Sequence, residues 1–123
     1  MWIIVGIGGA LGSIARYLSA AALTRWYPSA FPWGTFGVNV AGSLVIGLII
    51  GLSQRHGWSD PWRIFLATGF CGGFTTFSSF SLENVQLLRQ GDYTVFAAYA
   101  AASLVLCLLA TAAGLLLSNP NPT

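Results

Sequence analysis

Four long apolar runs, separated by short polar links, decide what this chain can fold into. The runs cover residues 2–23, 33–52, 62–88 and 93–117. A helix needs about 20 mostly apolar residues to cross a lipid bilayer, and each run reaches that length. Only 7% of the 123 residues are charged, against roughly a quarter in soluble domains. We therefore expect an all-α integral membrane protein, with four transmembrane helices in one domain that covers residues 1–123.

Charge and polar residues exclude two other function classes. The net charge is +2, and the five Arg are scattered along the chain without any Lys, so no basic cluster is present to bind nucleic-acid phosphates. The only histidine, His56, lies in a polar link, and no acid–base or nucleophile–base pair can be assembled. Cys71 and Cys107 lie in apolar runs without zinc spacing. We expect neither an enzyme nor a nucleic-acid-binding protein.

The arginines give little information about orientation in the membrane. With four spans both termini share one side, and that side also holds Arg55 and Arg63. The opposite side holds Arg25 and Arg89, with Arg16 in the last turns of the first run. The positive-inside rule then has almost no asymmetry to act on. Two readings stay open: one orientation fixed by another feature, or insertion in both orientations to give an antiparallel pair.

The third run differs from the others because small and hydroxyl residues crowd its middle. Gly69, Gly72 and Gly73 are followed by hydroxyl residues from Thr75 to Ser81. Such residues are also common where membrane helices simply pack closely, which is the alternative reading. Irregular backbone at this depth is tolerated only where it is buried in protein or lines a cavity, and freed carbonyls there can coordinate ions. We favour a helix broken at mid-membrane, between Gly72 and Thr75.

The first run begins with glycines that match two motifs. GIGGALG is similar to a dinucleotide fingerprint, but no strand or βαβ unit accompanies it. Gly8 and Gly12 form a GxxxG motif, which in membrane helices is typical of close packing between backbones. We expect this face to pack against another helix. Because one copy of such a bundle encloses too little to hold a pore, we also expect a homo-oligomer.

Several polar side chains inside the runs are candidates for a functional site, since polar groups are costly in hydrocarbon. Arg16 either reaches the nearby interface or forms a positive vestibule for anions. Asn39 either joins two helices or offers its amide NH2 to an anion. Glu83 is expected to pair with an arginine or to cap a backbone group. Tyr99 and Ser103 are four residues apart and therefore share one face of the fourth run.

Three strings of residues resemble one known family. They are GGALGSIARY at 9–18, GTFGVNVAGS at 34–43 and GFCGGFTTFSSFSLE at 69–83, of which the third is long and specific. Over its whole length the chain resembles the Fluc fluoride channels, also called CrcB proteins, with mild departures at Phe74 and Ser79. The resemblance implies an antiparallel dual-topology homodimer with two anion pores. It also implies passive export of toxic fluoride across the bacterial inner membrane, and a structural sodium ion at the dimer centre.

The resemblance also assigns roles to particular residues. Phe77 and Phe80 match the pore rings, and Asn39 matches the pore amide. The backbone carbonyls of Gly72 and Thr75 match the ligands of the sodium ion. The remaining counterparts are Arg16 for the basic residue of the first helix, Glu83 for the acid of the third helix, and Thr76, Ser78, Ser79, Tyr99 and Ser103 for the anion path.

These side-chain types suit fluoride, which is small, strongly hydrated and a strong hydrogen-bond acceptor. Amide and hydroxyl groups donate without a fixed charge, so they replace water without trapping the ion. The positive edge of an aromatic ring can also face an anion. A cation at the dimer centre would make the interior more favourable to anions.

Two other function classes stay open at this stage. A small dual-topology multidrug exporter would also be short and four-helical, but it needs a buried carboxylate in its first helix, and residues 2–23 contain no Asp or Glu. A non-conducting membrane assembly protein would explain the glycines, but not two phenylalanines beside hydroxyls. A fluoride flux assay in vesicles separates the three classes.

Overall fold

The computed structural model describes residues 1–121, which form helices joined by short links. Three helices are long and apolar enough to cross a membrane, namely α1 (Trp2–Trp26), α2 (Trp33–His56) and α6 (Tyr93–Ser118). The other segments are α3 (Asp60–Arg63), the π-helix η1 (Ile64–Cys71), α4 (Gly72–Phe74) and α5 (Phe77–Arg89). Residues 1–121 contain no strand, so the expected all-α class is confirmed.

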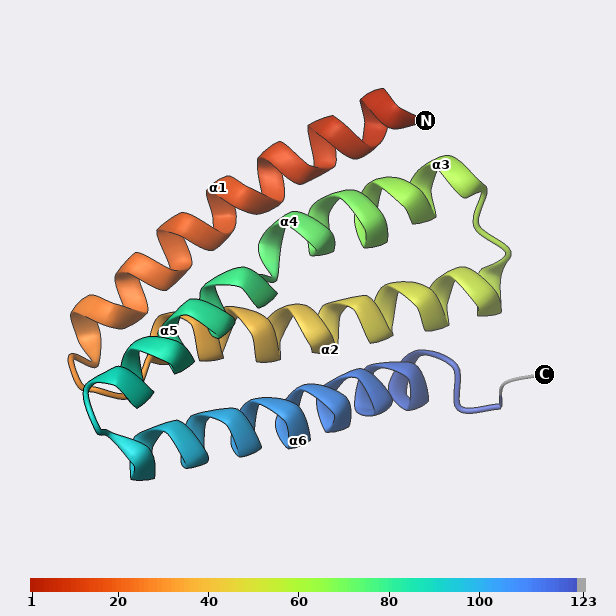
Figure 1. Ribbon diagram of the computed structural model, residues 1–123. Coiled ribbons are helices and arrows are strands. Elements are labelled where there is room, and N and C mark those ends of the chain that lie inside the picture. Colours follow the sequence, from red (N-terminus) through yellow and green to blue (C-terminus); the bar gives the residue numbers. More distant parts are fainter. Residues whose placement is uncertain (122–123) are drawn as a thin grey trace.

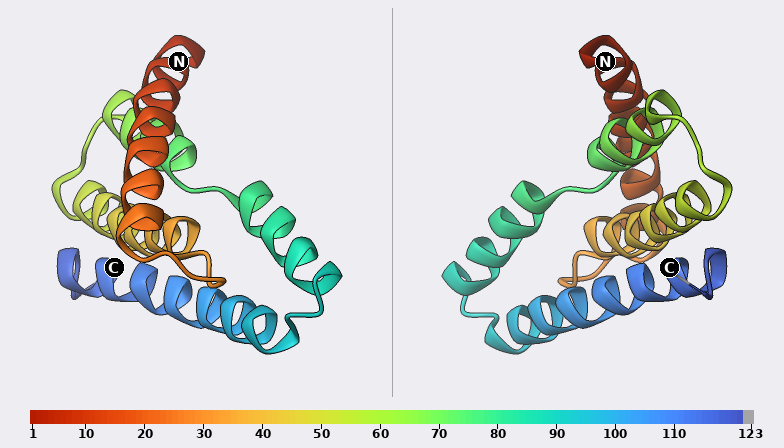
Figure 2. Two further views of the ribbon diagram at one scale, coloured as in Figure 1. Left: turned by 90° about the vertical axis from the view of Figure 1, so that its left-hand side faces the viewer. Right: turned by 90° about the vertical axis from the view of Figure 1, so that its right-hand side faces the viewer.

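Segments α3 to α5 together run the length of the molecule as one interrupted pass (Figure 1). The N-terminus and the end of α6 lie at the same end of the molecule as the link between α2 and α3. Seen from the side, α5 stands apart from η1 and α4 and reaches them through an extended segment (Figure 2). The chain therefore passes along its long axis four times, and the third of these passes is the irregular one.

The observed helices extend beyond the apolar runs. α1 continues to Trp26, and α2 continues to His56, which therefore belongs to a helix and not to a link. The apolar length sets what can lie in lipid, whereas helical hydrogen bonding continues until a residue ends it. At the end of α2 that residue is Gly57, whose φ of 63° is left-handed and whose N–H donates to the Ser53 carbonyl. The third pass begins at Asp60, with Pro61 in its first turn.

Two seams hold these helices together. The most extensive contact joins α2 to α6, and the next joins α1 to η1. Gly8 and Gly12 of α1 are buried in the second seam. A Cβ atom on Gly8 would lie 2.6 Å from the Phe65 carbonyl oxygen, and one on Gly12 would overlap the Phe70 carbonyl oxygen. The expected close packing of this GxxxG face is confirmed.

Few large apolar side chains of the described residues are buried, and many are exposed. Along α1, more than half of the surface of Trp2, Ile14 and Leu18 is exposed. The largest fully buried side chains are those of Tyr99 and Val38. A soluble domain buries its large apolar residues preferentially, so this distribution fits a chain surrounded by lipid or by a second copy.

Candidate functional site at the helix break

The third pass is interrupted at Thr75 and Thr76. Both residues have extended backbone, with φ −92° and ψ 157° at Thr75 and φ −150° and ψ 119° at Thr76. Helix α5 begins directly afterwards, at Phe77. The sequence placed the irregular region between Gly72 and Thr75. The extended residues lie at the end of that stretch and one residue beyond it, because Gly72 and Gly73 are still helical in α4.

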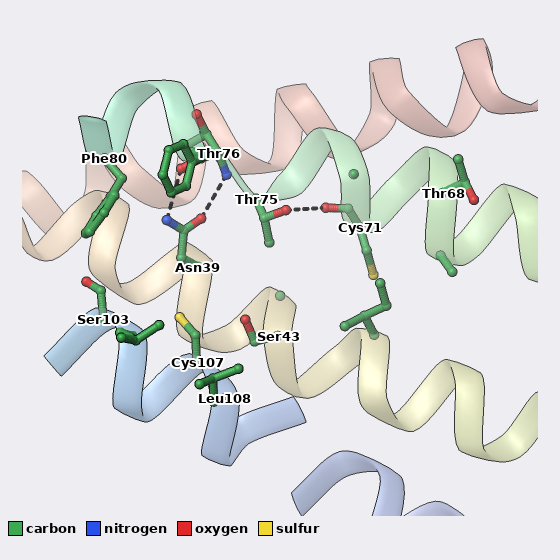
Figure 3. A pocket seen from close by; sticks show the side chains of 16 residues that line it. Asn39, Ser43, Thr68, Cys71, Thr75, Thr76, Phe80, Ser103, Cys107 and Leu108 are labelled. Atoms are coloured by element: carbon green, nitrogen blue, oxygen red, sulfur yellow. Dashed lines mark hydrogen bonds between the residues drawn. The ribbon is translucent and has the colours of Figure 1, made fainter. Parts of the chain in front are cut away.

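Side chains from α1 and α2 replace hydrogen bonds that the break removes. The Oδ1 atom of Asn39 accepts the Thr76 N–H at 2.8 Å, and its Nδ2 donates to the Thr76 carbonyl at 3.0 Å (Figure 3). The Nε of Arg16 donates to the Gly73 carbonyl at 3.0 Å. Arg16 is therefore directed at the break, and not at the interface. Asn39 joins two segments and still has a second amide hydrogen to offer, because an amide NH2 has two donors.

Two carbonyl groups at the break have lost their α-helical donors. In a continuous helix the Thr76 N–H would donate to the Gly72 carbonyl, but here it donates to Asn39. The Ser79 N–H would donate to the Thr75 carbonyl, but it caps α5 by donating to Thr76 Oγ1 at 3.1 Å. Gly72 is exposed, with open space beside its Cα atom. The carbonyls of Gly72 and Thr75 are thus available to an external partner, and carbonyl oxygens are ligands that hard cations prefer.

A cavity of about 440 Å³ lies beside the break, between α2, the third pass and α6 (Figure 3). Phe77 and Phe80 line it, with ring centroids 5.6 Å apart and planes tilted by 47°. Asn39 lines it from α2 and Ser103 from α6. The Ser103 hydroxyl is buried and has no hydrogen-bond partner among the described residues. The wall therefore combines aromatic rings with uncharged donors.

The structure places other predicted residues of the anion path outside this cavity. Ser78 is exposed at the start of α5, with its hydroxyl 3.2 Å from Thr76 Oγ1, and Ser79 takes part in the same cap. Tyr99 is completely buried behind Phe80, and their ring centroids are 5.0 Å apart. Phe77, in contrast, is 78% exposed. One chain therefore encloses only part of the surface around the two phenylalanine rings.

Glu83 lies in a separate hydrogen-bond network. Its Oε1 accepts the Tyr99 hydroxyl hydrogen at 2.9 Å, and its Oε2 accepts the Thr35 hydroxyl hydrogen at 2.8 Å. The expectation that Glu83 pairs with an arginine or caps a backbone group is wrong. Within residues 1–121 the only ion pair joins Arg63 to Asp60. The physical reason is position, since Glu83 faces hydroxyl groups on α2 and α6.

Two residues near the site were not singled out from the sequence. Thr35 lies four residues before Asn39 on α2, so the helical spacing of two polar side chains could have indicated it. Phe31 lies in the link between α1 and α2, and its ring centroid is 5.3 Å from that of Tyr99. A single phenylalanine in a link belongs to no periodic pattern, so only the folded chain reveals this contact.

These features define a class of protein. Three helices can cross a membrane, and the irregular backbone of the remaining pass lines a cavity, which is the setting in which a membrane protein tolerates such backbone. The cavity offers donors without fixed charge beside two freed carbonyls. The chain is a multi-pass integral membrane protein, and its candidate site offers hydrogen-bond donors and carbonyl oxygens that can contact ions.

The chain belongs to the CrcB-like protein family, described as "CrcB-like protein, Camphor Resistance (CrcB)", whose profile matches residues 3–115. Three similar curated relatives are each named "Fluoride-specific ion channel FluC". The one from Gloeothece citriformis is 47% identical over 115 residues, which cover 94% of both chains. The one from Nitrobacter winogradskyi is 49% identical over 113 residues, or 90% of this chain and 89% of the relative. The one from Bacteroides fragilis is 46% identical over 115 residues, or 91% of both. The resemblance inferred from the three strings is confirmed.

Proposed function

We propose that this protein is a fluoride-selective channel that lets fluoride leave the cell passively across the bacterial inner membrane and so relieves fluoride toxicity. The observation behind the proposal is the cavity beside the break, where rings and uncharged donors share one wall. The names of relatives at 46% to 49% identity support the choice of ion. A multidrug exporter is disfavoured because α1 holds no acidic side chain.

The donors of the cavity act by replacing the water around the anion. The remaining amide hydrogen of Asn39 and the unpaired hydroxyl of Ser103 point to hydrogen bonds with a dehydrated anion. The edges of Phe77 and Phe80 add weaker, positively polarised contacts between these donors. Because none of these groups is a cation, the anion is stabilised at several places and held tightly at none.

We also propose that the carbonyls of Gly72 and Thr75 hold a structural sodium ion, together with the same carbonyls of a second copy. The support is that both carbonyls have lost their helical donors, while the Gly73 carbonyl between them is occupied by Arg16. A set of neutral oxygens suits a monovalent hard cation better than zinc or calcium. When bound, the ion supplies a positive charge that makes the interior more favourable to anions.

The functional unit we propose is an antiparallel homodimer, in which the interrupted pass of each copy also crosses the membrane. Phe77 is largely exposed in one chain, so a second copy can complete the wall around it. Arg55 and Arg63 lie at one end of the folded molecule, where α2 ends and α3 begins, while Arg25 and Arg89 lie at the opposite end, in the last turns of α1 and α5. This balance gives the positive-inside rule no preferred orientation. Reporters fused to the termini should detect both orientations, and a single orientation would rule the antiparallel pair out.

Fluoride efflux from liposomes tests the main proposal. Purified protein is reconstituted into vesicles loaded with potassium fluoride, and efflux is followed with a fluoride electrode after a potassium ionophore is added. We expect rapid fluoride efflux and slow chloride efflux. Drug-dependent proton movement without fluoride efflux would instead identify the exporter class, and neither activity would identify an assembly protein.

Two ring substitutions test whether the cavity is the path. Phe77→Ile and Phe80→Ile keep the bulk and remove the aromatic edge, so fluoride efflux should fall sharply while the yield of dimer stays normal. Phe74→Ile is the matched control, because the Phe74 ring stacks on Phe70 with centroids 5.9 Å apart and does not line the cavity. Unchanged efflux in both path variants, and in Asn39→Ala, would place the path elsewhere.

A further inference from the structure

A second cavity, of about 270 Å³, lies at the end of the molecule where α1 and α5 end and α2 begins (Figure 1). We call it the end chamber. Its wall combines three aromatic side chains, one carboxylate and several neutral polar groups, namely Tyr27, Phe31 and Trp33, then Glu83, and Thr24, Ser29, Gln86 and Gln90. Glu83 is the only charged side chain among the described residues that line it. The end chamber therefore differs from the cavity at the break, whose described wall carries no charge.

The carboxylate of Glu83 has no positively charged partner within residues 1–121. Its two oxygens accept hydrogen bonds from the Tyr99 and Thr35 hydroxyls, at 2.9 Å and 2.8 Å, and both donors are neutral. An ionised carboxylate has about four lone-pair positions, so each oxygen can accept a further hydrogen bond. A part-buried charge in a membrane protein is costly unless an opposite charge comes close. The end chamber thus presents an acceptor that lacks a counter-charge.

The arginines near this end of the molecule do not supply that counter-charge. Arg25 and Arg89 lie at the same end, but both are exposed and neither lines the end chamber. Arg16 is directed at the Gly73 carbonyl. The positive partner of Glu83 is therefore to be sought outside the described chain.

The aromatic side chains of the end chamber favour an ammonium ion as this partner. The Trp33 ring contacts the other two rings, with centroids 4.5 Å from that of Phe31 and 6.4 Å from that of Tyr27. Ser29 Oγ accepts the Phe31 N–H at 3.1 Å and so fixes this part of the wall. The negative face of an aromatic ring attracts a positive charge, and rings are a common means of recognising ammonium groups. The described residues contain no group of three or more His, Cys, Asp or Glu side chains that could hold a metal ion.

We propose that the end chamber binds a primary ammonium group, with Glu83 as its counter-charge and Trp33 as its aromatic contact. The side-chain carbonyls of Gln86 and Gln90 can accept further N–H bonds. Tyr27 and Trp33 lie where the spanning helices α1 and α2 end and begin, a depth at which aromatic residues meet lipid headgroups. The ammonium group of a phosphatidylethanolamine headgroup reaches this depth, and a free amine in solution has the same chemistry. The inference is independent of the proposed channel function.

Charge-selective labelling of a cysteine tests whether the end chamber attracts cations. In a background with Cys71→Ala and Cys107→Ala, Gln86→Cys is labelled in a neutral detergent by two methanethiosulfonate reagents of opposite charge. We expect the ratio of the trimethylammonium rate to the sulfonate rate to be about tenfold higher than at Thr94→Cys, because opposite charges attract strongly where water is partly excluded. Thr94 is exposed at the start of α6 and does not line the end chamber.

Protection from labelling identifies the source of the ammonium group. With an uncharged methanethiosulfonate reagent, millimolar ethanolamine should slow the labelling of Gln86→Cys severalfold, whereas ethylene glycol and sodium chloride should not. The labelling is then repeated in nanodiscs of phosphatidylethanolamine and of phosphatidylglycerol. Slower labelling in phosphatidylethanolamine identifies the lipid headgroup, and protection by ethanolamine alone identifies an amine from solution. Protection in neither experiment would overturn the inference.

Two substitutions separate the carboxylate from the ring. Glu83→Gln keeps the shape and one accepting oxygen but removes the charge, so the ratio of the two labelling rates should fall to that of the control site. Trp33→Leu should keep the charge preference and weaken the protection by ammonium groups. Trp26→Leu should change neither, because Trp26 ends α1 without lining the end chamber. A charge preference that Glu83→Gln leaves unchanged would contradict the proposed site. If Gln86→Cys does not fold, Gln90→Cys reports on the same wall.

Discussion

The two halves of the interrupted pass are held in place by different forces. The first half, η1 and α4, packs against α1 with backbones in contact at Gly8 and Gly12. The second half, α5, has only small contacts with α2 and α6, and polar groups hold it through Asn39 at its start and Glu83 in its middle. Figure 2 shows α5 standing away from the first half.

The two halves of the pass are held differently because they have different neighbours. Close glycine packing anchors the first half on the side that faces α1, while its other side, with Ala67, Thr68, Cys71 and Gly72, lines the cavity. The second half, α5, has no such closely packed neighbour on its other side, so directional hydrogen bonds contribute more to holding it in place. The chain thus combines a rigid anchor with a segment that presents rings and donors to an open space.

The largest effect is expected from adding a bulky side chain to the glycine contact between α1 and η1, and tolerance of such a side chain would contradict the difference between the two halves. Gly12→Val introduces a side chain where a Cβ atom already overlaps the Phe70 carbonyl oxygen, so the α1–η1 seam must open. We expect loss of the monodisperse protein peak in detergent by size-exclusion chromatography. Gly6→Ala is the control on the same helix, because a Cβ atom there meets nothing within 4 Å. A normal peak for Gly12→Val would show that the seam is not tightly packed.

Substitutions of the polar groups that hold α5 should lower fluoride efflux more than they lower the yield of folded protein. Asn39→Asp keeps the oxygen that accepts the Thr76 N–H, but it loses the amide donor and adds a negative charge in the cavity. We expect fluoride efflux to fall by about tenfold or more, since a lost charge-assisted hydrogen bond costs about 1.5 kcal/mol or more. Asn39→Gln tests whether the amide alone is sufficient. Efflux near wild type for Asn39→Asp would exclude the amide as an anion donor.

The Glu83 network should give an intermediate effect. Tyr99→Phe removes one hydroxyl and leaves Glu83 with the Thr35 hydroxyl as its partner. Glu83 is part-buried and keeps its bond to Thr35, so loss of this one bond costs about 1 kcal/mol, and we expect lower thermal stability and severalfold slower efflux. Tyr93→Phe makes the same chemical change at an exposed position of α6 and should be neutral in both assays. Equal behaviour of the two variants would contradict a role for the network.

The smallest effect is expected in the α2–α6 seam, far from the break. The Ser118 hydroxyl donates to the Gly114 carbonyl of its own helix at 2.6 Å, and it also lies 3.4 Å from the Gly47 carbonyl of α2, so Ser118→Ala removes a polar contact of this seam without touching α5. Polar bonds in membrane proteins average about 0.6 kcal/mol, so we expect a slightly lower midpoint of thermal aggregation and unchanged fluoride efflux. A large fall in efflux would mean that the seam communicates with the path.

The amino-acid sequence by itself determined the class of the protein and the region of its irregular pass. Run length and scarcity of charge depend only on composition along the chain, and they decide whether a segment is compatible with lipid. The close packing of Gly8 and Gly12 was predictable for the same reason, because a small-residue motif is local. The region around Gly72 and Thr75 was marked by a run of glycine and hydroxyl residues, although local composition did not identify which two residues become extended.

Only the tertiary structure decided how the polar residues pair. Asn39 bonds to Thr76, Arg16 to Gly73, and the Glu83 carboxylate to hydroxyls of two other helices. These partners are separated by 16 to 57 residues in the chain. A hydrogen bond requires donor and acceptor to lie within about 3 Å with the right alignment, and that depends on how whole helices are placed against one another. No local pattern encodes this placement, and so the sequence indicated which residues are polar and buried while the packing of the helices chose the partner of each.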